Sequence, residues 1–186
     1  VHSETRLFTA LFGLLCWDCL FDDEVPGAFL TPFQDAPLDL RAPGGLFLLS
    51  PHRKAVVSSR LAEIAKMTKR DLRSALADSW TQHAGLQCAG LNWQSWSADH
   101  ESLLDAGACI GGPALAVVFG TLASGYRTWA CGMPDLCLYD TRTWTARLIE
   151  VKGPRDSLSD IQRAWLHVLV ELPGSVGVTV CHVKEP

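Results

Sequence analysis

The feature that most constrains the fold is a pair of neighbouring apolar segments that carry acidic side chains. Asp135 begins the first segment, residues 135–139, while the second, residues 145–151, contains Glu150 and is followed by Lys152. Side chains two positions apart on a β-strand lie on one face, so we expect Glu150 and Lys152 to point the same way. The short turn between the segments predicts a β-hairpin, which would bring Asp135 alongside them.

This arrangement of charges is typical of a metal-dependent site that breaks phosphodiester bonds. Two carboxylates can hold Mg²⁺ or Mn²⁺, and a neighbouring ammonium can position water against phosphorus. Glu150 lies in a segment so rich in Leu, Ile and Val that we expect the strand to be buried on both faces. A buried carboxylate is costly without a partner such as a metal ion. An ordinary hairpin with exposed charges is the alternative, because this triplet also occurs by chance.

The order of the predicted elements indicates an α/β chain with an all-helical middle. Helices are expected over residues 3–21, 53–66, 69–83, 101–108, 113–124 and 158–171, and strands over residues 135–139, 145–151 and 176–182. We expect Thr68 to cap the helix that follows it, and Ser157 with Asp160 to form a capping box before the last helix. Residues 26–51 are rich in proline and glycine, which predicts an irregular connector.

The composition limits the classes of protein to which the chain can belong. With 186 residues, 48% of them hydrophobic and 19% charged, the chain is long and apolar enough for one globular domain with a sizeable core. No apolar run is long enough to span a bilayer, so we expect no membrane partner. Seven cysteines without the spacing of a disulfide framework favour a reducing, intracellular compartment.

The net charge of −4 disfavours nucleic acid as a partner, but the charges are unevenly distributed. Residues 52–73 hold seven basic side chains against two acidic ones, and such a local basic stripe is typical of phosphate binding. A solvated helix face explains the stripe equally well. The candidates for DNA contact in this stripe are Arg53, Lys54, Lys69, Arg70 and Arg73.

Four motifs together resemble the virus-type replication-repair (VRR) nuclease module, a branch of the PD-(D/E)xK restriction-endonuclease-like superfamily. They are Gly132-Met133-Pro134-Asp135, residues 148–154, Gln162-x-x-Trp165 and residues 180–183. Over its whole length, the chain is most similar in this superfamily to the C-terminal nuclease domain of the Fanconi-associated nucleases, with further likeness at residues 11–18, 37–40 and 111–113.

The resemblance implies a fold and its boundaries. The fold would be α/β, with a restriction-endonuclease-like core of order α-β-β-β-α-β and a helical insertion after the first helix. Residues 1–186 would form a single VRR-type nuclease domain, with the core in residues 1–25 and 109–186 and the insertion at about residues 26–108. In the family this insertion accompanies a monomeric enzyme. We also expect the chain to be part of a longer protein, whose upstream domains would bind the protein partners.

The resemblance further implies a metal-dependent, structure-specific DNA nuclease, with 5′-flap endonuclease and 5′-to-3′ exonuclease activity in DNA interstrand-crosslink repair. The substrate would be branched or flapped DNA and the cofactor Mg²⁺ or Mn²⁺. The enzyme would lie in the compartment that holds the DNA, which is the nucleus in a eukaryote and the cytoplasm in a bacterium. Two alternatives are a catalytically idle DNA-binding scaffold, disfavoured by the intact acid-acid-lysine set, and a dimeric Holliday-junction-type resolvase, disfavoured by the long insertion.

The same resemblance assigns roles to individual residues at the hairpin. Asp135 and Glu150 match the metal-binding carboxylates, and Lys152 matches the lysine that orients the attacking water. The carbonyl of Val151 would be an additional metal ligand. Glu4, on the first helix, matches a further acid of the metal site.

Two positions after the hairpin also bear on the site. From its own neighbourhood Gln162 is an ordinary exposed glutamine, but it matches the family's glutamine that follows the lysine motif. The chain departs from the family at Ser157, where an arginine is expected. Arg155 lies two residues earlier and is the candidate for the corresponding DNA contact.

Overall fold

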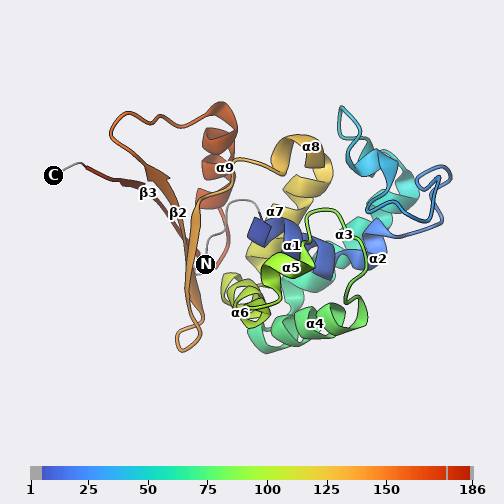
Figure 1. The fold of residues 1–186 in the computed structure, drawn as a ribbon, viewed down its shortest axis with the longest axis horizontal. Coiled ribbons are helices and arrows are strands. Elements are labelled where there is room, and N and C mark those ends of the chain that lie inside the picture. The colour runs from blue at the N-terminus through green and yellow to red at the C-terminus, as the bar shows by residue number, and fades with distance from the viewer. Residues whose placement is uncertain (1–5, 175, 185–186) are drawn as a thin grey trace.

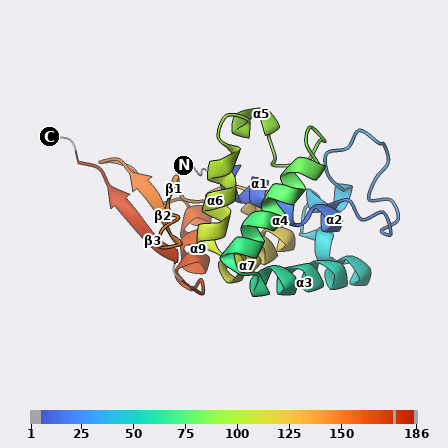
Figure 2. The ribbon, with the colours of Figure 1, turned by 90° about the horizontal axis from the view of Figure 1, so that it is seen from below.

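The computed structural model describes residues 6–174 and 176–184, and it places a small β-sheet beside a larger helical body (Figure 1). The sheet lies at one end of the molecule, and the view from below shows the same division (Figure 2). Helix α9, Asp160–Val170, lies against the sheet on the side of the helical body.

The apolar N-terminal segment forms two helices where one was predicted over residues 3–21. Helix α1 spans Arg6–Leu15 and α2 spans Trp17–Leu20. Between them Cys16 has φ −112° and ψ 22°, and this departure from helical dihedral angles divides the segment. The predicted helix start at residue 3 lies outside the described residues.

The middle of the chain is helical, as predicted. After the 3₁₀ helices η1 (Leu38–Leu40) and η2 (Leu46–Leu48) come α3 (Pro51–Lys66), α4 (Lys69–Gln82), α5 (Trp93–Trp96), α6 (His100–Ile110), α7 (Gly112–Ser124) and α8 (Tyr126–Trp129). Thr68 caps α4 as predicted, since its hydroxyl accepts a 3.2 Å hydrogen bond from the N–H of Asp71. No single helix of the described residues is long and apolar enough to cross a membrane, and only α6 with α7, bent by 101°, passes that test as a pair.

The C-terminal third forms the predicted hairpin, helix and final strand. Strand β1, Leu136–Asp140, pairs antiparallel with β2, Thr145–Lys152, and β3, Val176–His182, runs parallel to β2. The sheet therefore has the order β1-β2-β3, with α9 in the crossover between the two parallel strands.

Among the described residues two strands precede α9, where the resemblance implied three, so the core has the order α-β-β-α-β. A third strand would come from the segment before β1, but that segment contains α8, then Gly132 with φ +75°, then Pro134. A positive φ and a proline without an N–H both interrupt a β-ladder. The mixed α/β class is confirmed, whereas the α-β-β-β-α-β order is corrected.

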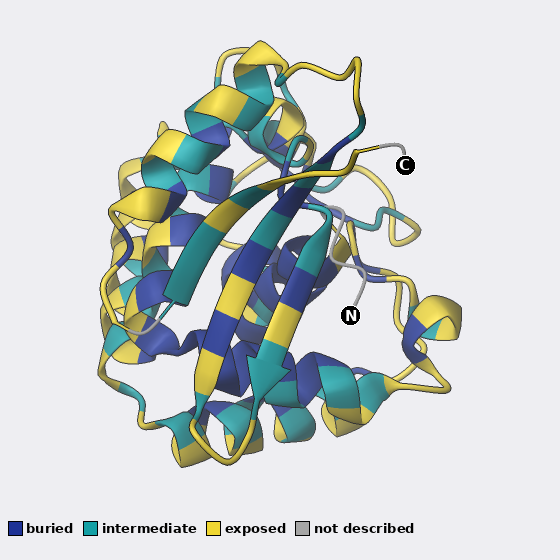
Figure 3. Ribbon diagram, turned by 90° about the vertical axis from the view of Figure 1, so that its left-hand side faces the viewer, coloured by how far each residue is buried: buried dark blue, intermediate teal, exposed yellow. Residues whose placement is uncertain are grey.

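The described helices lie behind one face of the sheet, and no described helix covers the face that is turned to the viewer in Figure 3. Along β2, buried residues alternate with more exposed ones, and Leu148, Glu150 and Lys152 lie on the buried side while Arg147 is exposed. The prediction that this strand is buried on both faces is therefore wrong, because a two-layer arrangement leaves the outer face without a covering layer. Glu150 and Lys152 face the helical body.

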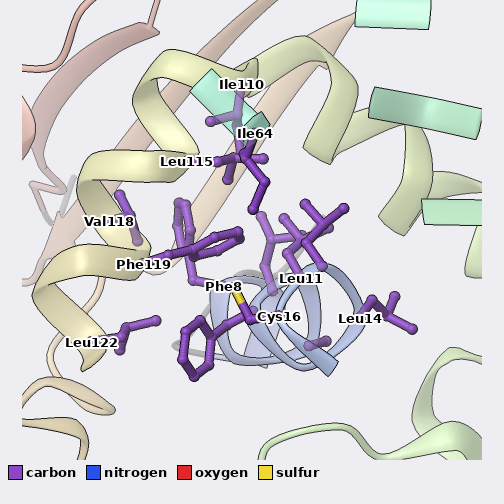
Figure 4. Close-up of a cluster of buried hydrophobic side chains, with 14 of the residues drawn as sticks. Phe8, Leu11, Leu14, Cys16, Ile64, Ile110, Leu115, Val118, Phe119 and Leu122 are labelled. Atoms are coloured by element: carbon purple, nitrogen blue, oxygen red, sulfur yellow. The ribbon is translucent and has the colours of Figure 1, made fainter. Parts of the chain in front are cut away.

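One hydrophobic core joins α1 to the helices around it (Figure 4). Phe8 of α1, Ile64 of α3 and Phe119 of α7 belong to this cluster, and all three are fully buried. The rings of Phe12 and Phe119 meet edge to face with centroids 5.5 Å apart. Helices from residues 26–108 therefore share their core with α1 and α7.

Candidate active site

The hairpin brings the two acids and the lysine to one end of the sheet. Leu136 of β1 pairs with Ile149 of β2, so Asp135, one residue before β1, lies beside Glu150. The N–H of Val151 donates a 2.7 Å hydrogen bond to Asp135 Oδ2 and ties the start of β1 to the end of β2. Asp135 and Glu150 are therefore brought together by strand register.

Glu150 is a buried charge whose partners are fixed. Only 1% of its surface is exposed, and its Oε1 accepts hydrogen bonds from Lys152 Nζ at 2.9 Å and from Gln162 Nε2 at 2.6 Å. A buried carboxylate is unfavourable unless such bonds compensate for its lost hydration. The same two bonds hold the carboxylate in one orientation.

Lys152 is held in its protonated form by its surroundings. Its hydrogen bond to Glu150 raises its pKa against the opposing effect of desolvation, and the charges of Glu150, Asp135 and Asp156 raise it further. A lysine with a raised pKa is an ammonium at neutral pH, so it donates hydrogen bonds and does not accept a proton. In this protonated form Lys152 can orient water and stabilise negative charge.

Gln162 of α9 connects these two charged groups. Its Oε1 accepts from Lys152 Nζ at 3.1 Å and from the N–H of Ser159 at 2.9 Å, while its Nε2 donates to Glu150. Gln162 is partly buried by these contacts, so its interpretation as an ordinary exposed glutamine is wrong. The structure places it in the site, beside both charges.

Ser159 is a neighbour of the site that the sequence reasoning missed. The capping box of α9 forms between Ser159 and Gln162, and not between Ser157 and Asp160 as predicted. The prediction placed the helix two residues too early, since α9 begins at Asp160. The signal that could have found it is the Ser-x-x-Gln spacing of residues 159–162. This spacing fits a capping box as well as the predicted pair, Ser157 and Asp160, does.

Asp135 and Glu150 fit a divalent cation that prefers oxygen ligands. Among the described residues neither Asp135 Oδ1 nor Glu150 Oε2 has a hydrogen-bond or ion-pair partner, so each carboxylate has one oxygen left for a ligand. Mg²⁺ is commonly held by one or two carboxylates, with water and substrate phosphates completing its shell. Within the described ranges no three His, Cys, Asp or Glu side chains gather for a metal, and Glu4 lies outside those ranges.

The predicted DNA-binding stripe does not form a continuous surface, because several of its basic side chains point into the protein. Arg53 is the clearest example. Arg53 is fully buried, with Nη1 donating a 2.6 Å hydrogen bond to the carbonyl of Cys19 and Nε lying 3.5 Å from Asp39 Oδ2. Its guanidinium carbon also lies 4.8 Å from the centre of the Phe47 ring. Arg53 points into the helical body, so its prediction as a DNA contact is corrected.

Lys69 also makes its contacts within the protein. Its Nζ donates to the carbonyls of Cys109 at 2.7 Å and Trp144 at 3.1 Å, which joins the start of α4 to the end of α6 and to the β1–β2 turn. Burial lowers its pKa by desolvation. The ammonium is therefore engaged in the fold and is removed from the predicted stripe.

Arg73 is the third basic residue with protein partners. Its Nε lies 2.6 Å from Asp105 Oδ1 and its Nη2 pairs with Glu101, both on α6. These three residues belong to helix faces that pack inward, which a count of charges along the sequence does not distinguish. The remaining predicted DNA contacts are exposed: Lys54, Arg70 and Arg155.

A family model for the VRR-NUC domain matches residues 67–185, which is more than half of the chain. The chain belongs to the VRR-NUC family. Fanconi-associated nuclease 1 homolog of Oryza sativa subsp. japonica is 43% identical over 190 residues, which cover 98% of this chain and 18% of that protein. Fanconi-associated nuclease 1 of Danio rerio is 39% identical over 185 residues, which cover 98% of this chain and 18% of that protein.

The solved structures agree with this membership of the VRR-NUC family. A crystal structure of paFAN1 bound to DNA with a 2-nucleotide 5′ flap and a gap matches with a TM-score of 0.80 and 30% identity, covering 100% of this chain and 32% of that one. The resemblance to the Fanconi-associated nucleases is thus confirmed. The chain spans about one fifth of the length of these curated relatives.

Proposed function

We propose that this VRR-NUC chain is a divalent-metal-dependent DNA phosphodiesterase. The observation that carries the proposal is the convergence of Asp135, Glu150 and Lys152, where each carboxylate has one oxygen left for a ligand. In a family of nucleases, this set has the chemistry that phosphodiester hydrolysis requires.

Asp135 and Glu150 would hold Mg²⁺ or Mn²⁺, with the Val151 carbonyl and Glu4 as further ligands. The bound ion would supply Lewis-acid activation of water and neutralise charge on the phosphate. Lys152, kept protonated beside Glu150, would orient that water and donate to the charge that develops on the phosphate oxygens. In-line attack on phosphorus would leave a 5′-phosphate and a 3′-hydroxyl.

We infer that the substrate is branched or flapped DNA, cut by 5′-flap endonuclease and 5′-to-3′ exonuclease activity in interstrand-crosslink repair. Support comes from relatives named Fanconi-associated nuclease 1 and from the paFAN1 structures with 5′-flap DNA. The exposed residues Lys54, Arg70 and Arg155 are the proposed phosphate contacts. The enzyme would act where the DNA is, in the nucleus of a eukaryote, with protein partners bound through other domains.

The domain boundaries inferred from the family are part of the same proposal. Residues 1–25 and 109–186 would form the nuclease core and residues 26–108 the helical insertion of a monomeric enzyme. Packing of α3 and α4 on the core helices is compatible with an insertion that became part of one folded unit. A single species at the monomer mass of about 20.3 kDa in light scattering is the expected result.

A cleavage assay with matched variants tests the proposed chemistry. Asp135→Ala and Lys152→Ala are expected to lower the cleavage rate of 5′-flap DNA by about a hundredfold or more, since each removes a group that acts on the reacting phosphate. Asp140→Ala removes the same kind of side chain from the opposite end of β1, where it pairs with exposed Arg142, and should cleave like the wild type. Wild-type rates for Asp135→Ala or Lys152→Ala would refute the assignment.

A further inference from the structure

We propose that Ser159 is a positioning residue for the site, acting through Gln162 on Glu150 and Lys152. The inference rests on the proposed nuclease function and adds a residue to it. Ser159 stands at the junction between the loop that leaves β2 and the first turn of α9. It touches neither of the charged groups directly.

The first link between Ser159 and the site is the pair of reciprocal hydrogen bonds that form the capping box. Ser159 Oγ accepts a 3.3 Å hydrogen bond from the N–H of Gln162, and the N–H of Ser159 donates a 2.9 Å bond to Gln162 Oε1. Several described helices have a side-chain cap at their start, but α9 alone among them closes the box from both sides. The backbone and the side chain of Gln162 are therefore held by one residue.

The second link is the orientation of the Gln162 side-chain amide. Its oxygen faces two donors, the Ser159 N–H and Lys152 Nζ, and its nitrogen faces the acceptor Glu150 Oε1. Turning the amide over would set donor against donor at Ser159 and Lys152, and acceptor against acceptor at Glu150. The capping bond thus selects the orientation in which Gln162 accepts from the lysine and donates to the carboxylate.

The third link connects the orientation of the Gln162 amide to Glu150 and Lys152. Gln162 Nε2 and Lys152 Nζ share Glu150 Oε1, which leaves Oε2 as the oxygen available to a ligand. If the first turn of α9 loosens, the amide loses its anchor and Glu150 loses one of the two bonds that fix it. The cap of α9 therefore helps to orient the Glu150 carboxylate through Gln162.

Ser159 is exposed, so substitutions there leave the core intact and allow a clear test. Ser159→Ala removes the hydroxyl, and we expect kcat on 5′-flap DNA with Mg²⁺ to fall by about tenfold, less than the hundredfold that a misplacement of about 1 Å can cost. KM should stay within about twofold, because no DNA contact is lost. Ser159→Thr keeps a capping hydroxyl and should restore the rate.

The matched control is Ser50→Ala, which removes the same hydroxyl from the cap of α3. Ser50 Oγ accepts from the N–H of Arg53 at 3.4 Å, and the start of α3, which this bond caps, is the end of that helix that points away from the sheet (Figures 1 and 2). Both variants lose a helix cap, but only Ser159→Ala should lose kcat. Equal losses in the two variants, or wild-type kcat in Ser159→Ala, would overturn the inference.

A second measurement makes the test independent of cleavage. In the NMR spectrum, the Gln162 side-chain amide protons are expected to be shifted and slowly exchanging in the wild type, and to exchange faster and move toward free-glutamine positions in Ser159→Ala, where the first turn of α9 is held less firmly. Absence of cleavage by the wild type would refute the proposed function but leave this test intact. A Gln162 amide that is already averaged in the wild type would refute the positioning role.

Discussion

At the scale of single residues, the site depends on a balance of charge within a buried environment. Glu150 is buried but receives two hydrogen bonds, and one of them comes from an ammonium that the carboxylate itself keeps charged. The exposed Asp140–Arg142 pair on the same hairpin has no comparable burial. Exposed pairs of this kind contribute little to stability, whereas breaking a buried pair leaves an uncompensated charge.

This coupling predicts a pH dependence of stability. The pKa of Lys152 is raised in the folded protein, mainly by its hydrogen bond to Glu150, so folding favours the protonated lysine. The pair's contribution is therefore complete below the ordinary lysine pKa and is lost as pH rises through the higher folded value. Urea denaturation at pH values on both sides of about 10.4 measures this loss.

The Glu150→Gln variant is the comparison for that measurement. Its side chain carries no charge to raise the pKa of Lys152, so its free energy of unfolding should fall less over the same alkaline range than that of the wild type. Other groups that titrate in this range contribute equally to both proteins. Parallel pH profiles for the two proteins would contradict the assigned coupling.

At the scale of elements, the helical body contains a point where two helices pack backbone against backbone. Helix α7 begins at Gly112, and a Cβ built there would lie 2.0 Å from the carbonyl oxygen of Ile64 on α3. Gly120 lies later in α7, and a Cβ there would meet only Leu61 Cδ1 at 3.5 Å, an ordinary contact. The start of α7 therefore packs directly against the backbone of α3.

These two glycines predict opposite effects of the same substitution. Gly112→Ala should lower the free energy of unfolding by about 3 kcal/mol, because backbone must move to admit the methyl group. Gly120→Ala should raise it by about 0.5 to 1 kcal/mol, because alanine is the better helix former. Chemical denaturation of both variants checks the pair, and equal effects would show that the α3–α7 contact is not as close as described.

The sequence predicted elements well where local signals agreed. The boundaries of β3 and the cap of α4 by Thr68 follow from patterns within a few residues, and both are confirmed. The predictions for Arg53 and Lys69 failed because the partners of these side chains, the carbonyls of Cys19 and Cys109, come from distant parts of the chain. Such contacts depend on how distant segments pack, and a count of charges along the sequence does not show which side chains become buried.

At the scale of the whole molecule, helices back one face of the sheet, and the proposed reaction lies on that face, at one end of the strands. Asp135, Glu150 and Lys152 come from a single hairpin, so their spacing was readable from the sequence. The connection to α9 through Gln162 required the crossover that leads to β3, and only the family resemblance had suggested it. Within residues 6–174 and 176–184 two strands precede α9 and not three, so the resemblance described the class of fold better than the order of its strands.

For the whole molecule, the central claim is that a divalent ion held by Asp135 and Glu150 drives DNA cleavage. The measurement that tests this claim most directly is the Mg²⁺ dependence of the single-turnover cleavage rate of 5′-flap DNA, for the wild type and for Asp135→Asn. We predict no cleavage by the wild type without a divalent ion, saturation as Mg²⁺ is added, and a rate at least about a hundredfold lower in Asp135→Asn. A wild-type rate that persists in chelator, or the same Mg²⁺ curve for both proteins, would contradict the account.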